Sequence, residues 1–142
     1  KLLIDRDYII MKKNEDDYFN SLTIHKKTTS INKPIQLSFD VLDIDESLLS
    51  SFSACLDYSK LQFPLIIRKW EEGDKFKPLG MSQYKKLSDF FIDLKFDVFS
   101  KKETFLLCSG NDIVWVIGHR IDERYKVTSK TKKMYIANLL EK

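Results

Sequence analysis

Few side chains in this sequence have the types and spacing that catalysis requires. The thiols and imidazoles are Cys55, Cys108, His25 and His119. Nucleophilic or metal-binding chemistry needs several such groups to converge, and no spacing here provides a metal-ligating set. Cys108 and His119 could form a thiol–imidazole pair, but a buried thiol and a histidine at the rim of the fold are the better interpretation. The carboxylates Asp122 and Glu123 are adjacent, so on a strand they would point to opposite faces.

The glycines exclude one further class of site. A loop that cradles phosphates needs clustered glycines, because backbone amides must approach the phosphate oxygens. The four glycines are scattered: Gly73, Gly80, Gly110 and Gly118. We therefore expect no nucleotide or other cofactor to bind this chain through a glycine-rich loop. Gly73, Gly80 and Asp74 are expected to shape a loop instead, the glycines through positive φ and Asp74 through bonds to nearby amides.

Basic side chains in two sets are the stronger candidates for function. They are interleaved with the aromatic residues Trp70, Phe76, Tyr84 and Tyr125. Cationic groups bind phosphate oxygens and release counterions, while aromatic rings can stack on exposed bases. We predict RNA contact through nine residues: Arg68, Lys69, Lys75, Lys77, Lys85 and Lys86 form the first basic set, and Arg120, Arg124 and Lys126 form the second.

The charge distribution supports a basic C-terminal part. Residues 1–59 carry seven Lys/Arg and ten Asp/Glu, whereas residues 60–142 carry seventeen and eleven. An imbalance of this kind indicates an anionic partner for the second part, typically nucleic acid. The two widely separated cysteines fit reduced buried thiols and a cytoplasmic protein. No apolar run approaches the roughly 20 residues of a membrane span, and the first residue is not Met, so we expect a piece of a longer protein.

The elements that must position these residues indicate an α+β fold of mainly antiparallel strands. The 142 residues are 43% hydrophobic, enough for one core or two small packed subdomains. We expect a strand-rich segment over residues 1–59 and a second domain over residues 60–142. Apolar runs and turn signals predict strands at 2–4, 8–11, 22–25, 35–39, 65–70, 105–108 and 113–117, with turns at 15–17 and 32–34. Residues 47–56 and 134–140 fit either a strand or a helix.

One helix is predicted over residues 84–95 and packs across a sheet. Leu87, Phe90, Phe91 and Leu94 recur at i, i+3, i+4 and i+7, which builds one apolar stripe. Lys85 and Asp89 are spaced to pair on its outer side. A second, short helical turn is predicted to begin at Ser100, which has Glu103 three residues later as in a capping box.

An ordered set of motifs resembles the C-terminal domain of bacterial tRNA(Ile)-lysidine synthetases. The motifs are RKWEEGDKFKPLGM at 68–81, KKLSDFFID at 85–93 and IVWVIGHRIDERYKVT at 113–128. The resemblance is specific from about residue 61 to residue 136. The stretches at 3–7 and 22–25 are similar to the preceding segment of the same family, less distinctively.

The resemblance implies a function that the residues alone do not. Members of this family use ATP, with Mg²⁺, to adenylate the wobble cytidine of the tRNA(Ile) that has a CAU anticodon. Lysine then displaces AMP, which changes the identity of the tRNA from methionine to isoleucine. The catalytic domain of the family is N-terminal and is not in this chain, so no catalytic residue is assigned here. The C-terminal domain is implied to hold the tRNA body, particularly its acceptor stem, with its own N-terminal domain as a further partner.

Two other functions stay open from the residues. The first is a protein-interaction or homodimerisation module anchored by Trp70, Phe76 and Tyr125. The second is a small hydrolase that uses Cys108 and His119. Association that persists in high salt with no RNA retained would favour the first, and a Cys108 that is inert towards alkylating agents would exclude the second.

Overall fold

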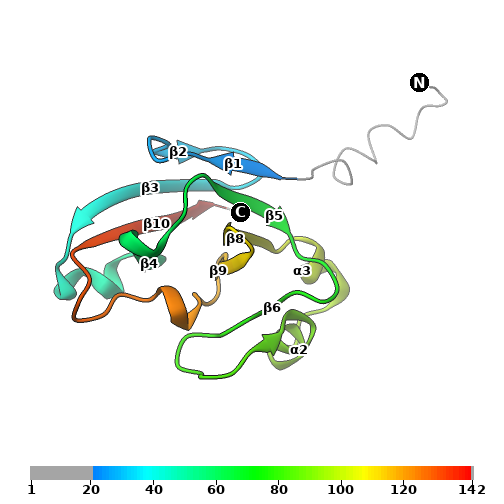
Figure 1. Ribbon diagram of the computed structural model, residues 1–142. Helices are drawn as coiled ribbons and strands as arrows, with labels where there is room; N and C mark the ends of the chain where they lie inside the picture. Colours follow the sequence, from blue (N-terminus) through cyan, green and yellow to red (C-terminus); the bar gives the residue numbers. More distant parts are fainter. Residues whose placement is uncertain (1–20, 142) are drawn as a thin grey trace, which may run out of the picture.

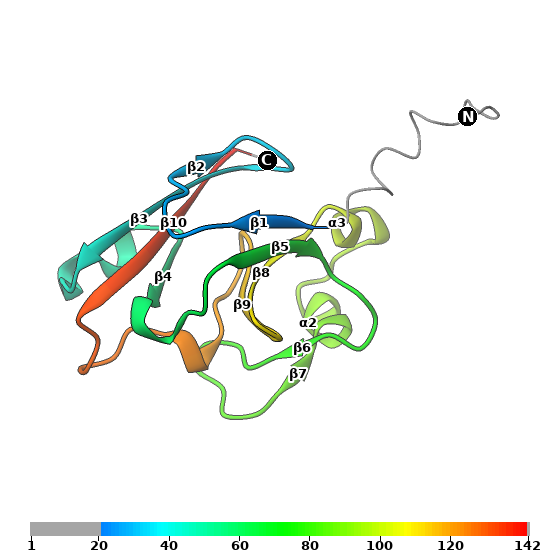
Figure 2. The same cartoon turned by 45° about the horizontal axis from the view of Figure 1, so that its top comes forward.

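Two four-stranded antiparallel sheets face each other in the computed structural model, which describes residues 21–141 (Figures 1 and 2). The first sheet has the order β1 (Leu22–Ile24), β5 (Leu65–Lys69), β8 (Phe105–Ser109) and β9 (Asp112–Val116). The second has the order β2 (Ser30–Ile31), β3 (Gln36–Asp43), β10 (Lys133–Glu141) and β4 (Ala54–Asp57). The strands predicted at 2–4 and 8–11 and the turn at 15–17 lie outside the described residues.

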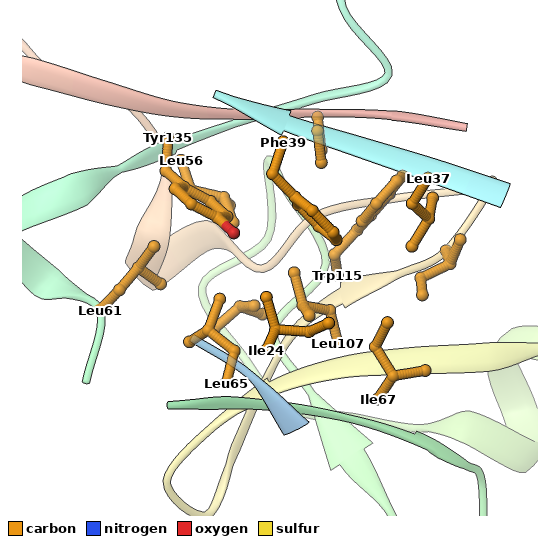
Figure 3. Close-up of a cluster of buried hydrophobic side chains, with 14 residues drawn as sticks. Ile24, Leu37, Phe39, Leu56, Leu61, Leu65, Ile67, Leu107, Trp115 and Tyr135 are labelled. Atoms are coloured by element: carbon orange, nitrogen blue, oxygen red, sulfur yellow. The ribbon is translucent and has the colours of Figure 1, made fainter. Parts of the chain in front are cut away.

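The main core fills the space between the two sheets. Figure 3 shows Ile67, Leu107 and Trp115 from the first sheet directed toward Leu37, Phe39 and Tyr135 from the second. Trp115 and Tyr135 are each 1% exposed. Both sheets take strands from either side of residue 60, because β1 pairs with β5 and β10 pairs with β3 and β4. The two parts of the sequence therefore share this core.

A second apolar cluster lies on the other face of the first sheet. Side chains alternate across β8, so Leu107 enters the main core while Leu106 and Cys108 enter the second cluster. Helix α2 (Leu87–Asp93) covers this face through Leu87, Phe90 and Phe91. Because β8 and β9 are covered on both faces, their sequences are nearly continuous apolar runs.

The predicted fold class is confirmed, and so is the helix that covers the sheet, but its limits were wrong. The helix starts at Leu87, because Lys85–Lys86 form strand β7, which pairs with β6 (Lys75–Phe76). It ends before Leu94, which is 37% exposed and not part of the buried stripe. Lys95 takes a left-handed φ of 59°, which stops the helix. The ion pair of Lys85 is made with Asp93 and not with Asp89.

The remaining predictions for local structure were mostly right. Residues 47–56 contain both candidates, a 3₁₀ turn η2 (Glu46–Ser51) followed by β4, and residues 134–140 lie in strand β10. The hairpin of β8 and β9 is confirmed. The predicted start of the short helix α3 (Val98–Lys102) was wrong. Asp97 and not Ser100 caps this helix, and the Asp97 side chain accepts the Ser100 amide at 2.7 Å.

No helix within residues 21–141 is long and apolar enough to cross a membrane.

The hydroxyl of Tyr135 gives a test of the core. The ring stacks on Phe39 with centroids 5.8 Å apart, yet within residues 21–141 its hydroxyl has no hydrogen-bond partner, and burial raises its pKa. An unpaired buried hydroxyl costs stability, so Tyr135→Phe is expected to raise the free energy of unfolding by about 1 kcal/mol in urea titrations. Tyr125→Phe is the matched control. It removes a 2.6 Å bond from the Tyr125 hydroxyl to Asp112 and should lower stability. A loss of stability from Tyr135→Phe equal to that control would contradict the assignment.

Candidate nucleic-acid interface

Arg68 and Asp74 organise the loop that follows β5. Both terminal nitrogens of Arg68 donate to the carboxylate oxygens of Asp74 at 2.9 Å. Asp74 also accepts the Glu71 amide at 2.7 Å, and its carbonyl accepts the amide of Leu87 at 2.9 Å. The bond to Asp74 raises the pKa of Arg68. The predicted role of Asp74 in shaping this loop is confirmed, and Arg68 is engaged in the same task.

The glycines of this loop behave as their sequence positions predict. Gly73 has a φ of 96° and Gly80 a φ of 93°, a region that side chains with a Cβ rarely adopt. Gly80 also donates its amide to Glu123 Oε1 at 2.8 Å, a bond between residues 43 positions apart. The loop is therefore attached at both of its ends.

Asp122 is the buried acid that joins the two basic sets. It is fully buried and accepts the backbone amide of Lys77 at 2.9 Å. From Arg124 it accepts the backbone amide at 2.8 Å, Nε at 2.9 Å and Nη2 at 3.0 Å. The side-chain bonds between Arg124 and Asp122 raise the pKa of Arg124. The amide of Glu123 also donates to the carbonyl of Lys77 at 2.6 Å, so the segment after β6 is fastened to the 3₁₀ turn η4 (Glu123–Tyr125).

Cations from both basic sets lie close to the exposed ring of Tyr84. Lys75 Nζ lies 4.9 Å and Lys77 Nζ 5.0 Å from the ring centroid. The guanidinium carbon of Arg124 lies 5.2 Å from it, and Arg124 Nη1 donates to the Tyr84 hydroxyl at 3.1 Å. Attraction between cations and the ring face holds these groups in place. We call Tyr84, Lys75, Lys77 and Arg124 the Tyr84 cluster.

The nine predicted RNA-binding residues divide into two kinds by their partners. Four have a carboxylate partner, in the pairs Arg68–Asp74, Lys85–Asp93, Arg124–Asp122 and Lys126–Glu123. Among the residues that the structure describes, four others show no carboxylate partner: Lys75, Lys77, Lys86 and Arg120. The ninth, Lys69, lies with its ammonium 6.0 Å from the ring of Phe105 and lines a separate groove with His119. Within the described part of the chain, four of the nine predicted residues thus carry a positive charge that no carboxylate balances.

Two of these lysines are directly opposite each other. Lys75 of β6 is in register with Lys86 of β7, and both side chains are exposed. Cross-strand partners project from the same face of a sheet, while Phe76, which follows Lys75, is fully buried against Phe90. Arg120 is also exposed, with its guanidinium 5.8 Å from the Phe90 ring. Lys75 and Lys86 are thus placed to meet one anionic ligand.

The positions of the other candidate residues argue against the alternative chemistries. Cys108 is 3% exposed, and burial raises its pKa to about 11, the opposite of what a nucleophilic thiolate needs. Phe76 is fully buried and cannot anchor a partner. Residues 21–141 hold no group of three or more His, Cys, Asp or Glu that could bind a metal ion.

Sequence reasoning missed the residues that assemble the interface. Asp122 was read only as half of an adjacent acid pair, yet it is fully buried at the start of η4 while Glu123 is half-buried. Asp112 was given no role in the site, and Tyr84 was considered only as a ring that could stack on bases. The signal for Asp122 was its position two residues before Arg124, since an aspartate that caps a turn bonds the amide two residues on.

Asp122→Asn tests whether this acid joins the two basic sets. An asparagine turns an NH₂ toward one of the donors and leaves Arg124 without its buried counter-charge. The expected loss is about 2–3 kcal/mol of unfolding free energy, measured by urea denaturation. Asp43→Asn is the control, because Asp43 pairs with Lys133 and its side chain is 86% exposed. This variant should change the free energy of unfolding by less than about 0.5 kcal/mol. Equal, small effects of both variants would show that Asp122 does not have this role.

Known proteins match both the sequence and the fold. The family described as the TilS substrate C-terminal domain matches residues 65–138, which include all nine predicted RNA-binding residues. The chain is 43% identical over 143 residues to a tRNA(Ile)-lysidine synthase of Parabacteroides distasonis, covering 99% of this chain and 33% of that protein. It is 35% identical over 97 residues to the enzyme of that name from Caldanaerobacter subterraneus, covering 68% and 21%. The chain thus spans a third or less of the length of these relatives.

Solved structures resemble the fold at low sequence identity. A crystal structure of the TilS C-terminal domain superposes with a TM-score of 0.64 at 13% identity, over 87% of this chain and all of that one. An N-terminal fragment of the phenylalanyl-tRNA synthetase β-subunit from Pyrococcus horikoshii gives 0.58 at 17% identity, over 82% of this chain and 46% of that one. The structures support the fold alone, while the family match covers more than half of the sequence. The resemblance inferred from the sequence motifs is therefore confirmed, and the chain belongs to the TilS C-terminal domain family.

Proposed function

We propose that this chain is the part of a tRNA(Ile)-lysidine synthase that holds the acceptor stem of the substrate tRNA. The relatives that carry this name support the proposal, since the chain corresponds to about a third of the Parabacteroides protein. The rest of the enzyme would bind ATP with Mg²⁺ and ligate lysine to the wobble cytidine of the CAU-anticodon tRNA(Ile), in the cytoplasm. In this arrangement the chain is a second attachment point and takes no part in the chemistry.

The in-register pair of Lys75 and Lys86 is the observation that carries the proposal. Like charges directly opposite in a two-stranded sheet are destabilising. Lys77 adds a third ammonium group to the same region through the Tyr84 ring. A phosphodiester strand would relieve this repulsion, and the release of its counterions would drive binding.

The surroundings hold these cations in position before any ligand binds. Asp74 fixes the loop before β6, Asp122 fixes the residue after it, and Tyr84 contacts both lysine side chains. Side chains that are already ordered lose less conformational entropy on binding. A rigid set of cations suits helical RNA, whose phosphates have fixed spacing and whose grooves are recognised by shape more than by sequence.

A distant attachment point would make the modification reaction more efficient. Once the acceptor stem is bound here, the anticodon of the same tRNA is confined near the catalytic part of the enzyme. Its effective concentration there rises without any new contact to the reacting base. The affinity required of this chain alone is correspondingly modest.

Contact with another protein surface is the second candidate function. Helices α2 and α3 expose Ile92, Val98 and Phe99, which are 64%, 68% and 67% accessible. Exposed apolar side chains that lie close together favour a protein contact, with the rest of the enzyme or with a second copy. Such a contact would persist in high salt, whereas the proposed RNA contact would not.

The RNA-binding proposal is tested by removing the unbalanced charges. The triple variant Lys75→Gln, Lys77→Gln, Lys86→Gln should bind an acceptor-stem hairpin of tRNA(Ile) at least about tenfold more weakly at low salt. The slope of log K against log salt concentration should become shallower by about two to three. Fluorescence anisotropy over a salt series measures both quantities.

A charge-matched variant controls for the loss of net charge. Lys27→Gln, Lys130→Gln, Lys132→Gln also removes three positive charges, from exposed positions outside the Tyr84 cluster. It should keep most of the affinity and the slope. If the two triple variants weaken binding equally, Lys75, Lys77 and Lys86 have no special role and the interface lies elsewhere.

A further inference from the structure

A small polar pocket opens beside the Tyr84 cluster. Its volume is about 230 Å³, and its lining includes Gly73, Lys75, Tyr84, Asn111, Asp112 and Arg124. Asn111 and Asp112 come from the tight turn between β8 and β9, which joins the two strands at Ser109 and Asp112. The pocket therefore lies between the loop that carries the unbalanced lysines and a turn anchored in the core.

The carboxylate of Asp112 keeps hydrogen-bonding capacity in this pocket. Oδ2 accepts the Tyr125 hydroxyl at 2.6 Å, and Oδ1 lies 3.2 Å from Nη1 of Arg124. Each carboxylate oxygen has two lone pairs, and the side chain is still 40% exposed. Tyr125 and Arg124 hold the carboxylate in one orientation, so Asp112 is a fixed acceptor with room for a further donor.

Asn111 supplies a neutral polar group next to this acceptor. It is exposed, and its amide has no hydrogen-bond partner among residues 21–141. A carboxylate repels phosphate, so the pocket itself is unsuited to phosphate. A carboxylate beside an amide suits a hydroxyl group, which both donates and accepts. The neighbouring Lys75 has no carboxylate partner in the described part of the chain. It is therefore suited to bind the phosphate next to the sugar whose hydroxyl enters the pocket.

We propose that Asp112 and Asn111 bind a ribose 2′-hydroxyl of the RNA strand whose phosphates lie on Lys75 and Lys77. The RNA backbone alternates ribose hydroxyls with phosphates, and here Lys75 lines the same pocket as Asn111 and Asp112. The 2′-hydroxyl is what lets a protein distinguish RNA from DNA at a given position. This inference rests on the proposed function, and it assigns to the site a selectivity that the lysines alone cannot provide.

The test compares two acceptor-stem hairpins of identical sequence. One is RNA, and the other carries 2′-fluoro groups in the stem, which keep the A-form geometry and the phosphates but cannot donate a hydrogen bond. The unaltered chain should bind the RNA hairpin at least about tenfold more tightly, as expected for a hydrogen bond to a charged group. The double variant Asn111→Ala, Asp112→Asn should lower that ratio to about one to two.

Two further variants separate recognition from folding. Asn111→Ala lies in an exposed turn and should lower the ratio without changing the melting temperature. Asn32→Ala removes an exposed turn amide far along the chain and should leave the ratio unchanged. Asp112→Asn is checked for melting temperature, because Arg124 and Tyr125 contact this residue.

The outcomes separate this inference from the proposed function. If neither hairpin binds at low salt, the proposed function fails and the inference falls with it. Equal binding of both hairpins by the unaltered chain overturns the inference but leaves the proposed phosphate contacts of the lysines intact. A preference for RNA that survives in the double variant also overturns it, because the hydroxyl is then recognised elsewhere.

Discussion

The assembly of the basic surface depends on one fully buried carboxylate, that of Asp122. Burying an ionised carboxylate costs several kcal/mol unless donors surround it. Here four hydrogen bonds do so, one from the Lys77 amide and three from Arg124. These bonds connect two stretches that lie 45 positions apart in the sequence. Together with the bonds from the Glu123 amide to the Lys77 carbonyl and from the Gly80 amide to Glu123, they fix the two basic sets relative to each other.

The cations of this surface have two different roles. Arg68 and Arg124 bond to Asp74 and Asp122, and the fork of a guanidinium matches a carboxylate better than an ammonium does. Among the described residues, Lys75, Lys77, Lys86 and Arg120 show no carboxylate partner. Arg68 and Arg124 therefore build the surface, and these four side chains give it its positive charge. Counting positive residues along the sequence overstates the number that are available to a ligand.

Much of the fold was predictable because its signals are local. Alternation in the strands and the spacing of Leu87, Phe90 and Phe91 depend on neighbouring residues, and the structure buries these side chains as predicted. The helix start was misplaced because Lys85 and Lys86 pair with β6, ten positions earlier, which local periodicity does not report. The cap at Asp97 was missed because Ser100 and Glu103 spell a competing signal at the same helix. Local pattern thus determined the elements, and long-range pairing determined their ends.

The interface was only partly predictable for the same reason. The nine basic residues were identified by type and spacing, but their partners depend on tertiary contacts. The bond of Lys77 to Asp122 spans 45 positions, and Arg124 reaches Tyr84 across 40. The pocket beside Asp112 also needs a turn and a loop from different parts of the chain. No pattern within either stretch contains that information.

A two-dimensional NMR titration of the ¹⁵N-labelled chain with the acceptor-stem hairpin tests the account most directly, because it maps the contact without altering any residue. The account predicts that the largest amide shifts fall at Lys75, Lys77 and Lys86 and in the turn at Asn111–Asp112, and that they fade as salt is added. Shifts centred on Val98 and Phe99 of α3, or a map that is insensitive to salt, would contradict it.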